Sequence, residues 1–203
     1  MSLAVYNSIL EQRLAELNAD FFPLLKGHSQ LTLEIGCGHG HFLTAYAEAH
    51  PKEFCVGIDL IPDRLQRAER KTTRAGRTNV VWVQAEAGLL VEALPHDCLL
   101  NRILVLFPDP WPKRRHWKNR LIQTAFLDAL AARTAIGAQL CFRTDHAPYF
   151  FYALDAIRSH ALWSIDAAAA WPFEIATVFQ NRAESYQSLI AVRSQQGASV
   201  QNK

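Results

Sequence analysis

The chain of 203 residues lacks long apolar segments, clustered cysteines and a strong excess of charge of one sign. No segment approaches the ~20 consecutive apolar residues that cross a bilayer. Residues 1–20 carry Glu11, Arg13 and Glu16 where a signal peptide needs an apolar stretch. We therefore expect a cytoplasmic protein without a membrane partner. The net charge of +2 does not by itself indicate a nucleic-acid partner, because the distribution of charge matters more than its sum.

The few cysteines are far apart in the sequence, at Cys37, Cys55, Cys98 and Cys141. We interpret them as small core residues in a reducing compartment, and not as disulfide or zinc-binding pairs. Cys37, His39 and His41 alternate through a glycine-rich stretch, but alternate residues in such a turn point to different sides. Because no fourth ligand is evident, the sequence predicts no metal site.

Half of the residues are apolar and a fifth are charged, which is typical of a domain with a well-buried core. We expect one domain over residues 1–203, with a helical lead-in over residues 1–30 and a frayed polar tail over residues 194–203. The expected assembly is a monomer or a homodimer.

The most informative stretch is Leu31–His41, L-T-L-E-I-G-C-G-H-G-H. A short apolar run carries Glu34 and then breaks into alternate glycines, Gly36, Gly38 and Gly40, before an amphipathic helix begins. Alternate glycines let a ligand approach bare backbone. The pattern therefore predicts a nucleotide-like ligand on a strand-to-helix turn.

Two further apolar runs lead to an acidic residue. Phe54–Leu60 contains Asp59, about 20 residues after the glycines, where a doubly wound sheet binds ribose hydroxyls. Val80–Val83 leads to Glu86. The chain lacks G-x-x-x-x-G-K-[ST], and its glycine turn departs from the dinucleotide fingerprint, so a phosphate-binding role is disfavoured. Three carboxylates at one sheet edge suggest a nucleoside with an amino or cationic part, and S-adenosylmethionine fits best.

A second informative stretch is Phe107–Leu121, F-P-D-P-W-P-K-R-R-H-W-K-N-R-L. Three alternate prolines restrict the backbone and hold Asp109 and Trp111 at the mouth of the preceding strand. Cations then follow without an intervening acid, at Lys113, Arg114, Arg115, Lys118 and Arg120. Cations interleaved with His116 and Trp117 suit a phosphate backbone and unstacked bases. This pattern favours an RNA partner.

The remaining segments alternate between strand and helix patterns. Expected helices are Leu3–Leu17, covering one sheet edge, Pro62–Gly76 and Tyr149–His160, and expected later strands are Asn101–Phe107, Gln139–Thr144 and Tyr186–Val192. The alternation predicts an α/β fold with a mostly parallel, Rossmann-like sheet, helices on both faces and a ligand at the carboxyl ends of the strands.

The expected helix Pro62–Gly76 carries a basic stripe, at Arg64, Arg67, Lys71 and Arg74. We interpret this stripe as a solvated helix face. It becomes an RNA contact only where it adjoins a basic rim of the active site.

The string P-D-P-W-P-K-x-R-H-x-K, at Pro108–Lys118, resembles the bacterial tRNA (guanine-N7)-methyltransferases, a branch of the Rossmann-like class I methyltransferases. The string T-D-x-x-x-Y at Thr144–Tyr149 supports this resemblance, which extends over Leu31–Gln180. The resemblance implies transfer of a methyl group from S-adenosylmethionine to N7 of a guanosine in the variable loop of tRNA.

The resemblance also assigns roles to individual residues. The implied cofactor-binding residues are Glu34, Gly36, Gly38, Gly40, Asp59, Glu86 and Asp109. Asp109 is also the implied catalytic residue. The implied substrate-binding residues are Lys113, Asp145, Thr177 and Gln180. The implied RNA-contacting residues are Arg114, Arg115, His116, Lys118 and Arg120.

The chain departs from the family pattern mainly on the substrate side. Asp59 stands where the family usually has Glu, and Glu86 stands where the family usually has Asp. Asn119 replaces an arginine, and Gln180 replaces the carboxylate of a T-x-[FY]-E element. One alternative is therefore a divergent paralogue that methylates a ring nitrogen of another RNA or a small heterocycle. Another is a non-catalytic RNA-binding module, although RNA binding alone requires neither the glycine turn nor its acids.

Overall fold

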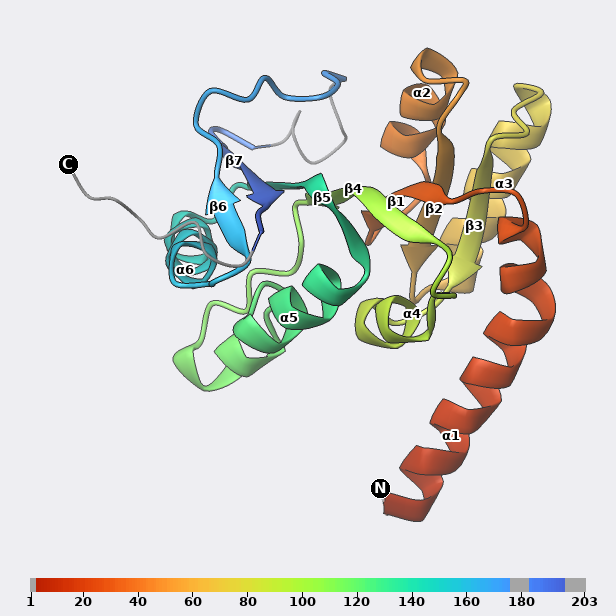
Figure 1. Cartoon of the computed structure of the whole chain (residues 1–203), viewed down its shortest axis with the longest axis horizontal. Helices are drawn as coiled ribbons and strands as arrows, with labels where there is room; N and C mark the ends of the chain where they lie inside the picture. Colours follow the sequence, from red (N-terminus) through yellow and green to blue (C-terminus); the bar gives the residue numbers. More distant parts are fainter. Residues whose placement is uncertain (1–2, 176–182, 196–203) are drawn as a thin grey trace.

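The structure, a computed structural model, describes residues 3–175 and 183–195. Its centre is a seven-stranded sheet in the order β3-β2-β1-β4-β5-β7-β6 (Figure 1). The strands are β1 Gln30–Ile35, β2 Phe54–Asp59, β3 Val80–Gln84, β4 Leu99–Leu106, β5 Thr134–Thr144, β6 Trp163–Ile165 and β7 Gln187–Arg193. Strands β1 to β5 are parallel, whereas β7 runs antiparallel between β5 and β6. The predicted mostly parallel α/β fold is confirmed.

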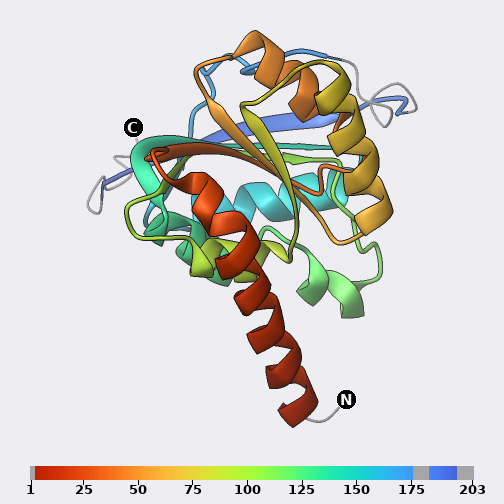
Figure 2. The same cartoon turned by 90° about the vertical axis from the view of Figure 1, so that its right-hand side faces the viewer.

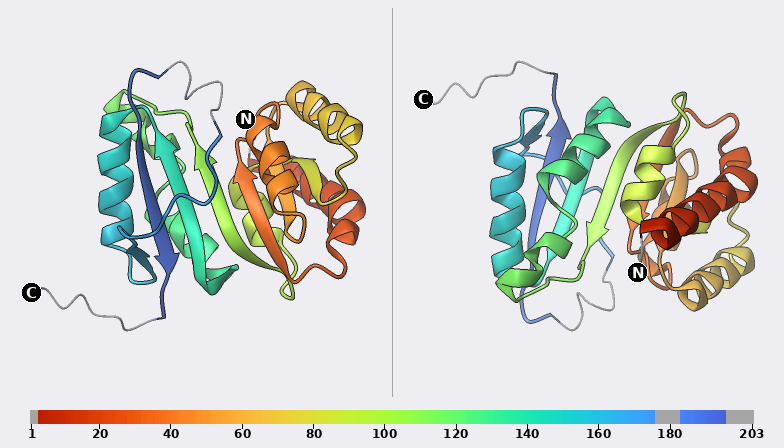
Figure 3. Two further views of the ribbon diagram at one scale, coloured as in Figure 1. Left: turned by 90° about the horizontal axis from the view of Figure 1, so that it is seen from above. Right: turned by 90° about the horizontal axis from the view of Figure 1, so that it is seen from below.

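Helices cover both faces of this sheet (Figure 3). The covering helices are α2 His41–Ala49, α3 Pro62–Arg74, α4 Ala87–Ala93, α5 Thr124–Ala132 and α6 Ala147–Arg158, and they are preceded by α1 Leu3–Glu16. Apolar residues of α2, among them Phe42 and Leu43, form one core layer with the sheet. Residues of α4, α5 and α6, such as Leu90 and Leu127, form the larger layer on the opposite face. Helices α2 to α6 thus each bury one apolar side against the strands.

The first helix differs from its prediction in position. A helix forms at α1, but Figure 2 shows that it projects from the body of the protein and does not cover a sheet edge. Short turns of π-helix and 3₁₀-helix, η1 Leu17–Phe21 and η2 Phe22–Leu25, connect it to β1 and bury Leu17, Phe21 and Leu25. The connector therefore anchors the helix, which itself remains largely exposed. No helix among the described residues is long and apolar enough to span a membrane.

The register of the parallel strands brings their carboxyl ends to one edge. Ile35 of β1 pairs with Ile58 of β2 and with Val105 of β4, and Val105 pairs with Phe142 of β5. The segments that follow β1, β2, β4 and β5 therefore all leave the sheet on one side. This edge, called the carboxyl edge below, is where the sequence placed the ligand.

Candidate active site

The glycine turn follows β1 and leads into α2. The backbone N–H groups of Gly36 and Cys37 both donate to the carbonyl oxygen of Ile58, at 2.9 Å each, which fixes the turn against β2. Gly36 and Gly38 have positive φ values of 73° and 55°, and a Cβ atom on either would meet open space. These two glycines therefore leave bare backbone for a ligand.

Gly40 has a different role from the other two glycines. A Cβ atom at Gly40 would lie 2.5 Å from the Trp82 ring and 2.6 Å from the Ala68 Cβ. Trp82 packs equally closely against Gly57 of β2, and its indole N–H donates to the Thr72 hydroxyl at 3.2 Å. Gly40 is therefore required by packing between the turn, β3 and α3.

Asp59 ends β2 directly beside the glycine turn. Its carboxylate accepts hydrogen bonds from the backbone N–H groups of Gly38 at 3.0 Å and Ile61 at 2.9 Å, and Arg64 lies 3.5 Å away. A carboxylate can accept about four hydrogen bonds, so capacity remains for a ligand hydroxyl. The predicted acid therefore lies next to the turn and helps to hold its shape.

Glu34 lies inside the protein beneath the turn, with 4% of its surface exposed. One carboxylate oxygen, Oε2, forms no hydrogen bond with any described residue. Burial, together with the nearby negative charge of Asp59, raises the pKa of Glu34 to about 8, although a backbone hydrogen bond from Leu43 opposes the rise. A buried carboxyl group with a vacant oxygen calls for a hydrogen-bond donor, and a cationic amino group would satisfy it best.

Replacing Glu34 by glutamine is expected to change how the free energy of unfolding depends on pH. The folded protein keeps a proton on Glu34 up to about pH 8, whereas an ordinary glutamate loses it near 4.5. Stability from this group is therefore present at low pH and is lost as the pH rises through that window, by up to several kcal/mol. In denaturant unfolding between about pH 5 and about pH 9, Glu34→Gln should gain stability relative to the original protein as pH rises. Parallel curves would contradict the assignment.

Glu86 does not join the other two acids. It precedes α4, and its half-exposed carboxylate forms an ion pair with Arg13 of α1. The structure therefore points this predicted cofactor-binding side chain toward the N-terminal helix, because α1 supplies a cation there. The carboxylates that meet at the glycine turn are those of Glu34 and Asp59.

The proline-rich segment after β4 forms a rigid loop at the carboxyl edge. Phe107 and Trp111, on either side of Pro108–Pro110, have positive φ values of 51° and 45°. Such values are uncommon and costly for bulky residues, and they persist only where the surroundings impose them. The Phe107 N–H donates to the Arg143 carbonyl oxygen at 2.7 Å. The loop exposes Asp109 to solvent.

Arg120 corrects the prediction of an RNA contact. Its side chain is buried, with 1% of its surface exposed, and its guanidinium lies 4.4 to 4.9 Å from the ring centroids of Trp117, Tyr149 and Tyr152. Its Nε donates to the Pro110 carbonyl oxygen at 3.0 Å. Burial lowers the pKa of Arg120. The residue thus supports the proline-rich loop from within and cannot reach a surface ligand.

The other predicted RNA-contacting residues remain accessible. A short 3₁₀-helix, η3 Arg114–Asn119, carries all four of them. Arg114, Arg115 and Lys118 are exposed, as is Lys113, the predicted substrate-binding residue just before η3. His116 is half-buried, with its ring 6.0 Å from the Trp111 ring in an edge contact.

On the substrate side, the structure describes Asp145 but not every predicted residue. Asp145 is exposed directly after β5, on the same edge as Asp109. Thr177 and Gln180 lie outside the described residues.

Sequence reasoning missed Arg143. It is buried in β5, with its guanidinium 4.0 Å from the Trp171 ring centroid and 4.8 Å from that of Tyr186, and it contacts both carboxylate oxygens of Glu174 at 2.8 and 3.1 Å. These contacts fix the segment around Trp171 beside the carboxyl edge. The available signal was an arginine within an otherwise apolar strand, Leu140–Thr144.

The cysteines and histidines near the turn do not form a metal centre in the described part of the chain, which contains no group of three His, Cys, Asp or Glu residues suited to a metal ion. All four thiols are buried and free, as predicted for small core residues. Burial raises the pKa of the Cys37 thiol, which disfavours the reactive thiolate.

This geometry agrees with the similarity of the chain to known proteins. Residues 28–194 match the model of a family described as putative methyltransferase. The chain is 32% identical over 179 residues to a tRNA (guanine-N(7)-)-methyltransferase of Rhizobium etli, and the match covers 83% of this chain and 76% of the relative. The chain belongs to the tRNA (guanine-N7)-methyltransferase family. The predicted resemblance is therefore confirmed.

Other relatives support this placement in the tRNA (guanine-N7)-methyltransferase family. The chain is 37% identical over 163 residues to the tRNA (guanine-N(7)-)-methyltransferase of Magnetococcus marinus. This match covers 77% of this chain and 64% of the relative. The chain thus spans less than two thirds of that relative's length. Its fold is similar to the crystal structure of the 16S rRNA (adenine(1408)-N(1))-methyltransferase of Catenulisporales acidiphilia, with a TM-score of 0.59, 19% identity and coverage of 93% and 91% of the two chains. The predicted Rossmann-like methyltransferase fold is confirmed.

Proposed function

We propose that this protein transfers a methyl group from S-adenosylmethionine to N7 of a guanosine in tRNA, in the cytoplasm. The observation that carries the proposal is the arrangement at the carboxyl edge. There, β1 carries Glu34, with its unpaired Oε2, and ends in the open glycine turn. The neighbouring strand β4 leads into the rigid loop of Asp109. The names of the family relatives supply the substrate class.

The residues at the turn fit this cofactor. Gly36 and Gly38 offer open backbone, and Asp59 retains capacity to accept a hydroxyl. Glu34 Oε2 is a buried acceptor without a donor, suited to an amino group. When bound, S-adenosylmethionine supplies an electrophilic methyl group. A cation beside Glu34 would favour its ionised form and release its proton.

The acceptor side requires positioning more than acid–base chemistry. Guanine N7 already carries a free lone pair, so no general base is needed, and alignment of the two reactants is the main requirement. Methylation leaves positive charge on the purine, which the carboxylates of Asp109 and Asp145 can stabilise while accepting hydrogen bonds from the base. Lys113, exposed four residues after Asp109, can contact a phosphate or the base carbonyl oxygen.

The direct test incubates the full chain with bulk tRNA and labelled S-adenosylmethionine, followed by mapping of the modified nucleoside. Labelled 7-methylguanosine in tRNA is the expected product. Because Gln180 replaces a carboxylate of the family pattern, methylation of a different RNA or a small heterocycle would support the paralogue alternative. The absence of S-adenosylmethionine binding by calorimetry would overturn the enzymatic assignment and leave an RNA-binding module.

Replacing Gly38 by alanine is expected to weaken S-adenosylmethionine binding by roughly tenfold or more, or ~1.4 kcal/mol. The new methyl group would stand in the open space above the turn. Gly76→Ala is a matched control, because Gly76 also has a positive φ of 63° and open space around it but lies just beyond α3. Both variants should lose ~1 kcal/mol of stability from backbone strain. Calorimetry measures the affinity for S-adenosylmethionine. An equal loss of this affinity in Gly38→Ala and Gly76→Ala would argue against a cofactor at Gly38.

A further inference from the structure

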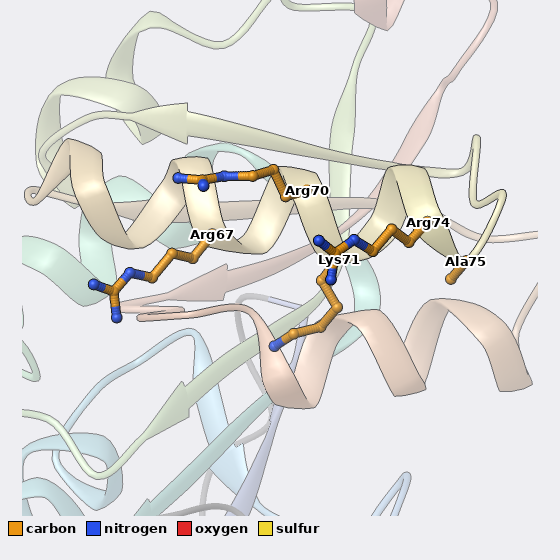
Figure 4. Close-up of a pocket in the computed structure, with 5 residues that line it drawn as sticks. All are labelled: Arg67, Arg70, Lys71, Arg74 and Ala75. Carbon is orange, nitrogen blue, oxygen red and sulfur yellow. The ribbon is translucent and has the colours of Figure 1, made fainter.

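Helix α3 carries a row of cations on one exposed face. The residues are Arg67, Arg70, Lys71 and Arg74, and together with Ala75 they line a hollow of about 530 Å³ (Figure 4). Their spacing of three, four and seven residues places them on one side of the helix over nearly two turns. The row is about 10 Å long at 1.5 Å per residue. A strand of nucleic acid carries one charge per roughly 3.4 Å, so the row can face about three phosphates.

These cations are not neutralised by acidic side chains. Among the described residues, Arg67, Arg70 and Arg74 form no ion pair. Asp63 lies one turn before Arg67 without pairing to it, and Glu69 lies about 200° around the helix from Arg67. Solvated surface arginines usually gain little from isolated pairs. A row of four cations with one carboxylate, Asp63, at its end still has a net positive charge, and its field attracts polyanions.

The row contacts the glycine turn directly. The Lys71 ammonium donates to the carbonyl oxygen of His39 at 2.8 Å and lies 3.0 Å from His41 Nδ1 at the start of α2. Figure 4 shows Lys71 pointing away from the three arginines, toward the neighbouring helix. Ala68 of α3 also packs against Gly40. The helix and the cofactor turn thus form one surface.

The two basic segments lie on opposite sides of the site. Helix α3 follows β2, η3 follows β4, and β1 with its glycine turn lies between those strands in the sheet. Figures 1 and 3 show α3 (gold) and the segment of η3 (green) on opposite sides of the central strands. A polyanion that contacts both must therefore pass across the carboxyl edge, where Asp109 and the turn are exposed.

We propose that the cationic row of α3 is a second RNA-docking surface, which binds the tRNA phosphate backbone on the side of the active site opposite η3. This inference rests on the proposed function for the identity of the RNA. An acidic polypeptide fits less well, because the regular spacing of the cations matches a phosphate backbone and the site between the two surfaces is open to a nucleoside.

The test compares two double charge reversals in the full chain. Arg67→Glu/Arg74→Glu alters the row, and Lys26→Glu/Arg158→Glu makes the same change in net charge at exposed residues before β1 and at the end of α6. Neither pair belongs to the proposed catalytic or cofactor machinery. Direct tRNA binding is measured by fluorescence anisotropy as a function of salt, and S-adenosylmethionine binding is measured by calorimetry.

The row variant is expected to weaken tRNA binding by roughly tenfold or more and to reduce the slope of log Kd against log salt by about 1.4 to 1.8. The control should change little, and cofactor affinity should be unchanged in both. Equal tRNA affinity for the two variants would overturn the proposal, as would equally strong binding of the original protein to polyglutamate. Row-dependent binding of tRNA without methylation would instead overturn only the proposed activity.

Discussion

Replacing Asp109 by alanine is expected to lower methyl transfer to tRNA by roughly 100-fold or more. The carboxylate is exposed at the carboxyl edge on a loop whose backbone is held in an unfavourable conformation at both ends. A group held in place before the reaction stabilises developing charge without the cost of reorganisation, and this explains the size of the expected effect. The measurement is kcat/KM with bulk tRNA and labelled S-adenosylmethionine.

Two further variants test whether the effect of Asp109 depends on its charge and whether it is specific to this position. Asp109→Asn keeps the size of the side chain but removes its charge, so most of the loss should remain. Asp155→Ala removes an exposed carboxylate from α6 and serves as the control, with full activity expected. The unfolding midpoint of Asp109→Ala should match that of the original protein because the side chain is exposed. Full methyl transfer by Asp109→Ala would contradict the catalytic role.

Replacing Arg120 by alanine is expected to cost roughly 3 kcal/mol of stability. The change leaves a cavity among three aromatic rings and removes the hydrogen bond to the Pro110 carbonyl oxygen. The ends of the guanidinium form no hydrogen bond with described residues, so the ring faces are its main partners. Denaturant unfolding at constant pH measures the loss.

The variant Arg120→Met tests whether Arg120 positions the loop of Asp109 as well as stabilising the fold. Methionine fills similar space without a buried charge, and such exchanges are often neutral. We expect stability within ~1 kcal/mol of the original protein. Methyl transfer should still fall roughly tenfold or more, or ~1.4 kcal/mol, because the loop of Asp109 loses its tether. The loss should be in kcat, with S-adenosylmethionine affinity unchanged. Unaltered kcat in a stable Arg120→Met protein would exclude a positioning role.

The sequence was sufficient to predict the central strands and the glycine turn. Apolar runs that end at a glycine, an acid or a proline mark β1, β2 and β4 closely, because strands buried on both faces are largely apolar. The element α4 was missed since seven residues, Ala87–Ala93, are too few to establish a helical period. The strand β6 has only three residues, Trp163–Ile165, and its conformation depends on pairing with β7.

Side-chain partners were harder to predict than backbone elements. Arg120 belongs to a basic run whose other members are exposed, yet it is buried because Tyr149 and Tyr152, some 30 residues later, return to enclose it. Glu86 follows its strand as expected, but Arg13 of a distant helix pairs with it. Local patterns carry no information on such long-range neighbours. The sequence also does not distinguish the open glycines Gly36 and Gly38 from Gly40, because that difference depends on the packing of Trp82 against Gly40.

The placement of β7 between β5 and β6 affects how the chain can fold during synthesis. The ribosome releases the first five strands in an order that lets each parallel pair form, but β6 pairs only with β7 among the described strands. Until Gln187–Arg193 emerges, β5 exposes a long unpaired edge, Thr134–Thr144, to other nascent chains. Completion of the sheet is therefore delayed to the end of translation of this region, and a chaperone that shields β5 would be most useful before β7 emerges.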